Sequence, residues 1–165
     1  MKIIKDNTIY IQAKDLKRLK ESNTIVSKSL LFLMHLLFNS YIDYNDEDFI
    51  LFNESDVNLD GIDWIINFDD IKDNTEEELT NTCNSLINQR NIIADKYNSL
   101  SIKDRVKNLK LLNQTRNLEY QINGYKDILD IKNGTKKLKL PEGIEYPDGF
   151  IKENKMKKLI NKIKK

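Results

Sequence analysis

The chain has 165 residues, 39% of them hydrophobic and 32% charged, and its formal net charge is +1. This length and composition predict one globular domain and exclude a disordered chain, while the single cysteine, Cys83, excludes an internal disulfide and favours a cytoplasmic protein. The longest apolar run, from Leu30 to Phe38 with His35 inside it, has nine residues, and because a membrane needs about 20, we expect no membrane span.

The N-terminal region predicts a β-hairpin followed by two helices. Two short apolar runs flank the turn-forming pair Asp6-Asn7. A short helix with Leu16 and Leu19 on one face follows. Residues from about 23 to 39 then predict a helix that is apolar nearly all round, which we expect at the buried centre of the domain.

Residues 43–78 carry fourteen carboxylates and one cation, Lys72, whereas the rest of the chain is basic. Charge concentrated in this way steers and orients a partner but does not specify a fold. Phe49–Phe52 predicts a buried strand, and five apolar residues between 62 and 68 also require a core. We therefore expect a folded segment with its carboxylates outward. The carboxylates expected to bind a partner are Asp43, Asp46, Glu47, Asp48, Glu54, Asp63, Asp69 and Asp70.

A short stretch inside the acidic segment, from Asp56 to Gly61, is similar to the first half of an EF-hand calcium loop. Oxygen-bearing side chains stand at alternate positions, and a glycine follows them for the sharp turn. The similarity then ends, because Asn67 stands where the loop needs its bidentate glutamate. A weak Ca²⁺ site and a metal-free acidic turn are the two alternatives, and no other cofactor is expected. The candidate Ca²⁺ ligands are Asp56, Asn58 and Asp60.

Residues from about 75 to 132 predict a pair of long helices. Thr75 and Glu78 have the spacing of a capping box at the start of the first helix. From Leu79 to Leu100 the seam residues recur every three or four positions, with Arg90 as the polar member.

The second helix of the pair restarts after Ser101. Its seam is predicted to include Val106 and Leu109 and to slip register once near Leu109–Leu112. The short connection implies an antiparallel pair. Whether the seam pairs within one chain or between two chains of a homodimer stays open at this point.

The C-terminal region begins at Asn133-Gly134, which is expected to end the second helix, with a hairpin turn as the alternative. Residues 137–140 alternate like a half-buried strand, and residues 151–165 predict a basic amphipathic terminal helix. This helix would bind nucleic acid, an anionic membrane or the acidic segment of a neighbouring copy, or would pack on the domain with its lysines in solvent. Its lysines proposed for nucleic acid are Lys152, Lys155, Lys157, Lys158 and Lys162.

No residue pattern in the chain fixes a chemical reaction. His35 is the single histidine and lies inside the apolar helix, where a hydrogen-bonded core histidine fits better than a general base. Cys83 occupies a seam position, which is typical of a small buried hydrophobe. We therefore expect a protein that is not an enzyme.

Three stretches, Ile62–Ile71, Asn88–Ala94 and Leu140–Pro147, are similar to small uncharacterised phage and prophage proteins of low-GC bacteria. The resemblance covers roughly residues 60–148, and that family carries no established activity. It implies a mobile-element origin, and small non-enzymatic proteins of mobile elements commonly occupy a host machine, as anti-CRISPR proteins do.

These patterns predict a mainly α fold with a minor β component (α+β), in which a long antiparallel helical hairpin packs with an N-terminal β-hairpin and a buried helix. We expect a single domain over 1–150, followed by the terminal helix at 151–165. The predicted function is a non-enzymatic module whose acidic segment 43–78 engages a basic surface of a protein or nucleoprotein in a bacterial host, such as a CRISPR effector. The alternative is a nucleic-acid-binding accessory protein that uses the C-terminal lysines.

Overall fold

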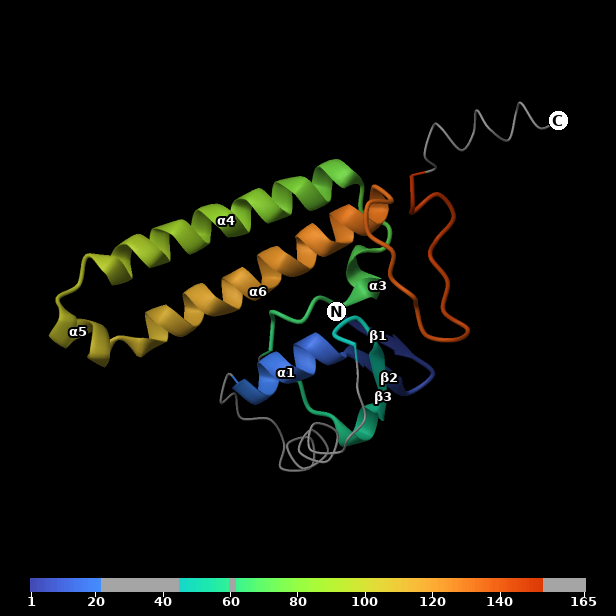
Figure 1. Cartoon of the computed structure of the whole chain (residues 1–165), viewed down its shortest axis with the longest axis horizontal. Helices are drawn as coiled ribbons and strands as arrows, with labels where there is room; N and C mark the ends of the chain where they lie inside the picture. Colours follow the sequence, from blue (N-terminus) through green and yellow to red (C-terminus); the bar gives the residue numbers. More distant parts are fainter. Residues whose placement is uncertain (22–44, 60–61, 153–165) are drawn as a thin grey trace. The chain divides into compact units, whose positions relative to one another are not determined.

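The computed structural model describes residues 1–21, 45–59 and 62–152. It is mainly helical with a small antiparallel sheet, which confirms the predicted fold class (Figure 1). The helix predicted near 23–39 and most of the terminal helix predicted at 151–165 lie outside the described residues.

The chain divides into two compact units. The first unit contains residues 1–71 and 138–145, and the second contains residues 72–137 and the chain from 146 onward. The single domain over 1–150 stays a prediction.

The first unit is built on a sheet whose strands follow the order β1-β2-β3. These strands are β1 (Lys2–Lys5), β2 (Thr8–Gln12) and β3 (Phe49–Asn53). Asp6 and Asn7 join β1 to β2 with φ values of 50° and 61°. A two-residue turn of this type needs positive φ at both positions, which asparagine and aspartate tolerate. The predicted hairpin is confirmed.

Part of the core of the first unit lies against the face of the sheet that carries Ile9 and Ile11, and Ile3 is buried on the other face. Ile9 and Ile11 of β2 pair with Phe52 and Ile50 of β3, and all four side chains are buried. Helix α1 (Ala13–Glu21) follows β2 directly and buries both of its leucines. The short helix predicted after the hairpin is therefore confirmed.

Strand β3 corrects the prediction of a strand that is buried as a whole. Ile50 and Phe52 are buried, but Leu51 between them is 62% exposed. Because four apolar residues follow one another in this strand, the sequence does not reveal which of them face the core.

Within the first unit, the acidic segment continues from β3 to Ile71 and reaches β1. The backbone amide of Lys2 donates to the carbonyl oxygen of Ile66 at 2.8 Å. Two short helices, η1 (Glu54–Asp56) and α3 (Phe68–Ile71), lie along this part of the chain. Six apolar side chains are buried between residues 62 and 71, which confirms that the segment contributes to a core; they are Ile62, Trp64, Ile65, Ile66, Phe68 and Ile71.

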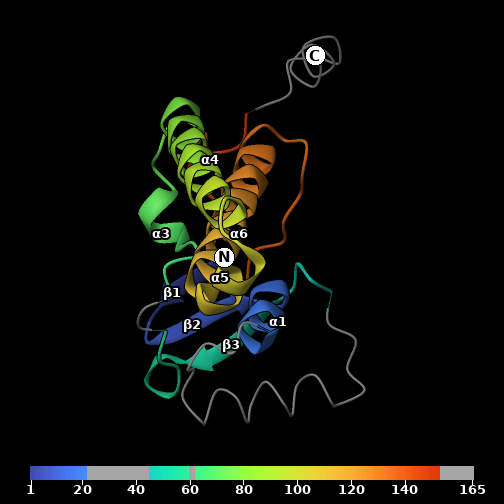
Figure 2. The ribbon, with the colours of Figure 1, turned by 90° about the vertical axis from the view of Figure 1, so that its left-hand side faces the viewer.

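The second unit is an antiparallel helical hairpin, in which α4 and α6 lie side by side (Figures 1 and 2). Its helices in the described part are α4 (Glu76–Asn98), α5 (Ile102–Lys107) and α6 (Leu109–Lys132). Lys132 Nζ donates to Asn74 O at 2.7 Å, so the end of α6 lies at the start of α4. Midway along the pair, Arg90 of α4 forms an ion pair with Glu119 of α6 at 3.3 Å. The seam therefore pairs within one chain.

Helix α4 begins with the predicted capping box. The backbone amide of Glu78 donates to Thr75 Oγ1 at 3.2 Å, and the amide of Thr75 donates to Glu78 Oε2 at 2.7 Å. The hydrogen bond from the Thr75 backbone holds the pKa of the Glu78 carboxyl below its usual value of 4.5. Because this pKa is lowered on folding, the stabilisation from Glu78 is present above pH 4.5 and is lost as the pH falls through the folded-state pKa.

Replacing Thr75 by alanine is expected to lower the free energy of unfolding by about 1 kcal/mol at pH 7, because the amide of Glu78 loses its side-chain acceptor. Urea unfolding followed by far-ultraviolet circular dichroism measures this loss. Thr75→Ser keeps a hydroxyl acceptor and is the matched control. Equal losses in both variants would show that the hydroxyl does not cap the helix.

Helix α5 corrects the predicted seam of the second helix. Val106 and Leu109, which were expected in the seam, are 68% and 53% exposed. Arg105 provides a physical reason, because its guanidinium donates to the carbonyl oxygens of Asn98, the last residue of α4, and of Leu100 in the connection that follows. The carbonyl of Asn98 has no partner inside the helix. These hydrogen bonds hold α5 against the end of α4 with Val106 out of the seam, and Leu109 is the first residue of α6.

Residues 137–140 form no strand, which corrects a third prediction. Their burial does alternate, since Leu138 is buried and Lys139 is exposed. A strand also needs a hydrogen-bonding neighbour, and none of the described strands pairs with these residues.

Candidate functional site

The carboxylates predicted to bind a partner fall into three groups in the first unit, and Asp43 lies outside the described residues. The first group, Asp46 and Glu47, precedes β3. The second group, Asp48 and Glu54, flanks the two ends of β3. The third group lies along residues 62–71 and consists of Asp63, Asp69 and Asp70.

The first group is paired with cations of the same unit. Asp46 forms an ion pair with Lys17 at 2.5 Å, and Glu47 forms one with Lys14 at 3.3 Å. Gln12 Nε2 also donates to Glu47 at 2.9 Å. The hydrogen bond from Lys17 holds the pKa of Asp46 below its usual value. These two carboxylates join the chain before β3 to α1, and less of their charge is left for a partner.

The third group is exposed on a well-anchored stretch of chain. Asp69 and Asp70 lie in the first turn of α3, where Phe68 and Ile71 are buried. Asp63 is exposed as well, and its neighbours on both sides are buried. The apolar side chains fix the backbone here, and the carboxylates lie on its outer side.

Strand β3 borders an open pocket of about 910 Å³ within the first unit. Tyr10 and Leu51 are cross-strand partners, and Phe49 lies on the same face of the sheet. On the other side of the pocket, Lys5 Nζ donates to the carbonyl oxygen of Gly143 at 2.5 Å and holds the chain that follows residues 139–142. The pocket is lined by Tyr10, Asp48, Phe49, Leu51, Lys139, Leu140, Pro141 and Glu142.

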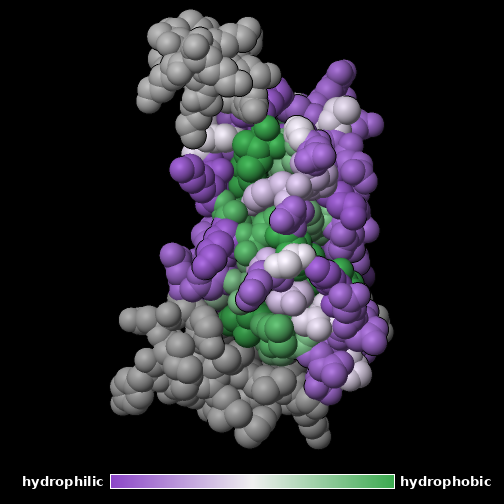
Figure 3. Space-filling model, turned by 90° about the vertical axis from the view of Figure 1, so that its right-hand side faces the viewer, coloured by the Kyte–Doolittle hydropathy of each residue, from purple (hydrophilic) through white to green (hydrophobic). Residues whose placement is uncertain are grey.

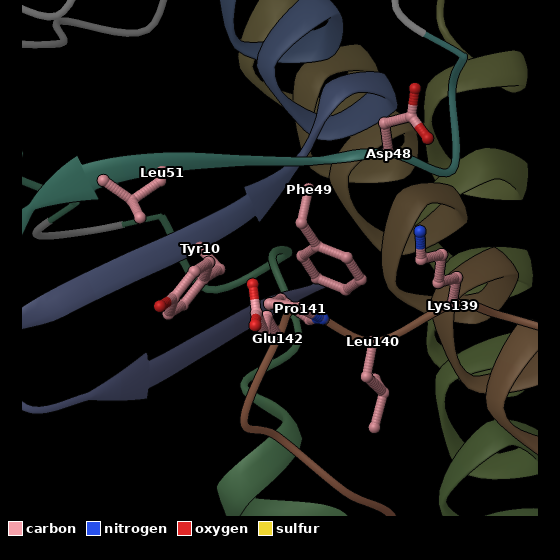
Figure 4. Close-up of a pocket in the computed structure, with 8 residues that line it drawn as sticks. All are labelled: Tyr10, Asp48, Phe49, Leu51, Lys139, Leu140, Pro141 and Glu142. Carbon is pink, nitrogen blue, oxygen red and sulfur yellow. The ribbon is translucent and has the colours of Figure 1, made fainter.

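Figure 4 shows the rings of Tyr10 and Phe49 beside Pro141 and Glu142, with Leu51 farther along β3. Figure 3 shows that hydrophobic side chains reach the surface between hydrophilic ones on the face in view. The residues that line the pocket combine an aromatic and aliphatic wall with charged groups of both signs.

Sequence reasoning missed this pocket, although one signal was present. Successive residues of β3 point to opposite faces of the sheet, and the residues from Phe49 to Phe52 are all apolar. The face that carries Phe49 and Leu51 is therefore apolar, as is the face that carries Ile50 and Phe52. A strand with two apolar faces has either a second cover or an exposed binding surface. The second wall comes from residues about 90 positions later in the chain, and no local pattern predicts that proximity.

The candidate calcium ligands are only partly described. Asp56 ends η1 and is exposed, Asn58 follows it, and Asp60 lies outside the described residues. Within residues 1–21, 45–59 and 62–152, no three His, Cys, Asp or Glu side chains lie close enough together to hold a metal ion. The Ca²⁺ site stays a prediction.

Of the lysines proposed for nucleic acid, only Lys152 is described. It forms an ion pair with Glu76, and its backbone amide donates to the carbonyl oxygen of Lys132 at 2.7 Å. The hydrogen bond from Lys152 holds the pKa of Glu76 below its usual value. Lys152 thus fastens the chain to the helical hairpin. The other members of the set, Lys155, Lys157, Lys158 and Lys162, lie outside the described residues.

None of the helices in the described part of the chain has the length and apolar character needed to cross a membrane. Comparisons with protein-family models, with curated proteins and with solved structures find no match.

Proposed function

We propose that this protein is a non-enzymatic binding module whose acidic residues engage a basic surface of a host protein or nucleoprotein. The observation that carries the proposal is the alternation of burial along residues 62–71. The apolar side chains of this stretch are buried, whereas Asp63, Asp69 and Asp70 are exposed.

An anchored carboxylate suits this role for two physical reasons. Its backbone is already ordered, so binding costs less conformational entropy than it would in a mobile chain. Its field also acts before contact and raises the association rate with a basic partner. Asp48 and Glu54, at the two ends of β3, add charge of the same sign.

An inhibitor of a host-defence nucleoprotein, acting in the cytoplasm of a bacterial host in the manner of an anti-CRISPR protein, is the specific form of this proposal. The resemblance of roughly residues 60–148 to phage and prophage proteins supports it. A nucleoprotein also offers the required surface, because the groove that binds a nucleic-acid backbone is rich in lysine and arginine.

The triple variant Asp63→Asn, Asp69→Asn and Asp70→Asn is expected to associate with the partner about tenfold more slowly at low salt, because asparagine keeps the side-chain size and removes the charge. The partner is obtained by affinity capture of the tagged protein from host lysate after nuclease treatment. Surface plasmon resonance at two salt concentrations then gives the association rate. The matched control neutralises three exposed carboxylates elsewhere, in the variants Asp95→Asn, Glu145→Gln and Asp148→Asn.

Equal association rates for the triple variant and the wild-type protein would contradict the proposal. If recovery of the partner collapses on nuclease treatment, the function moves to nucleic acid and to the C-terminal lysines. Truncation after Phe150 should then abolish binding, whereas it should leave binding through the acidic residues intact.

A further inference from the structure

The outer edge of β3 is open in the part of the chain that the structure describes. The sheet has the order β1-β2-β3, so β2 is the only described strand that pairs with β3. An open edge presents backbone amides and carbonyl oxygens that a further strand can bind.

The hydrogen bonds at the two ends of β3 show which of its residues face this edge. The amide of Ala13 donates to Asp48 O at 2.9 Å, and the amide of Glu54 donates to Asn7 O at 2.9 Å. Because backbone groups alternate in direction along an antiparallel strand, Ile50 and Phe52 also bond toward β2. The residues whose backbone groups face the outer edge are Phe49, Leu51 and Asn53.

In the residues that the structure describes, this edge lacks several of the devices that prevent strand addition. Soluble proteins protect an exposed edge with lysine, proline, a bulge or an inward-pointing charge. Phe49–Asn53 contains no charged residue and no proline, and its pairing with β2 is continuous over all five residues. Such an edge is typical of proteins that bind an extended peptide as an additional strand.

The pocket lies where side chains of an added strand would enter it. Successive side chains of a strand point to opposite faces of the sheet. Every second residue of a strand added to β3 would therefore lie on the face that carries Tyr10, Phe49 and Leu51. Leu51, which is 62% exposed, is available for an apolar contact.

The charged residues around the edge of β3 favour basic residues in an added strand. Asp48 precedes β3 and lines the pocket, and Glu54 follows β3 and is exposed. The opposite wall supplies Glu142 and one cation, Lys139. Carboxylates at both ends of the strand favour a segment that carries lysine or arginine.

We infer that β3 binds an extended basic segment of a protein partner by strand addition, with alternate apolar side chains of that segment in the pocket. This inference rests on the proposed function and specifies how the basic partner is engaged. Backbone hydrogen bonds supply the affinity, and the pocket and its carboxylates supply the specificity.

Selection of a displayed random heptapeptide library on the full chain tests the inference. The enriched peptides should alternate apolar residues with lysine or arginine. The Leu51→Lys variant should bind a synthetic copy of the best peptide at least about tenfold more weakly, because one exposed leucine contact and favourable charge are lost. Ile92→Lys makes the same change at an apolar residue of α4 that is 68% exposed and should bind like the wild-type protein.

N-methylation of the peptide separates strand addition from other binding modes. Methyl groups on one alternate set of amides should abolish binding, and methyl groups on the other set should leave it intact. The inference would be overturned by any of three results. The first is an equal effect of both methylated sets, and the second is enrichment of peptides without basic residues. The third is slow hydrogen exchange of the Leu51 amide in the free protein. The proposed function fails separately, if the Asp63, Asp69 and Asp70 variant associates with the captured partner at the wild-type rate.

Discussion

Replacing Asp15 by alanine is expected to lower the free energy of unfolding by about 3–5 kcal/mol, the cost of removing one partner from a buried ion pair. Asp15 lies on α1, and its side chain is 3% exposed. Asp15 Oδ1 accepts from Arg18 Nη1 at 3.0 Å, and Oδ2 accepts from the amino group of Met1. Alanine would leave the Met1 amino group buried without this carboxylate.

Urea unfolding followed by circular dichroism measures the loss, and Asp46→Ala is the matched control. Asp46 also pairs with a lysine of α1, but the two side chains, Lys17 and Asp46, are 44% and 59% exposed. Because solvent screens an exposed pair, this variant should lose only about 0–1 kcal/mol. A similarly small loss in both variants would show that burial adds nothing to the stabilisation by Asp15.

Elements with local determinants could be predicted from the sequence. The turn of the hairpin needs two residues that tolerate positive φ, and Asp6 and Asn7 supply both. The start of α4 needs an acceptor at the N-cap and a second one three residues later, and Thr75 and Glu78 supply them. In both cases the residues that form the structure are within four positions of one another.

Features that depend on distant residues could not be predicted. Asp46 and Glu47 were predicted to bind a partner, but the structure pairs them with Lys17 and Lys14. These lysines are 29 and 33 residues earlier in the chain, so no local sequence pattern shows the ion pairs. The wrongly predicted strand at 137–140 also depends on distant residues. Alternating polar and apolar residues indicate alternating burial, but a strand also needs a neighbouring strand to pair with.

The sequence predicted the exposed carboxylates of the candidate site, but it did not predict the pocket beside β3. The exposed carboxylates of residues 62–71 follow from the apolar residues between them, since those must reach a core. The pocket beside β3 brings together residues near positions 10, 50 and 140. Only the tertiary fold shows that Leu51 lies at an edge of the sheet with its side chain in solvent.

Trp64→Ala is expected to lower the free energy of unfolding by about 3–5 kcal/mol, because a large buried ring is replaced by a methyl group and the cavity is only partly refilled. Trp64 is 3% exposed and lies in the stretch that carries Asp63, Asp69 and Asp70. Circular dichroism is the suitable probe, since Trp64 is the single tryptophan and the variant has no indole fluorescence. Trp64→Phe keeps a large apolar ring and should lose less.

The same variant tests whether the fold holds the acidic residues in place for binding. Trp64→Ala should slow association with the captured partner at a temperature where the protein is still folded, although the change removes no charge. Leu79→Ala is the control for stability alone. Leu79 is fully buried in α4, so its loss should cost about 2–5 kcal/mol, yet it lies outside the unit that carries these carboxylates. If both variants bind equally fast, the anchor at Trp64 does not position the acidic residues, and their charge alone accounts for steering.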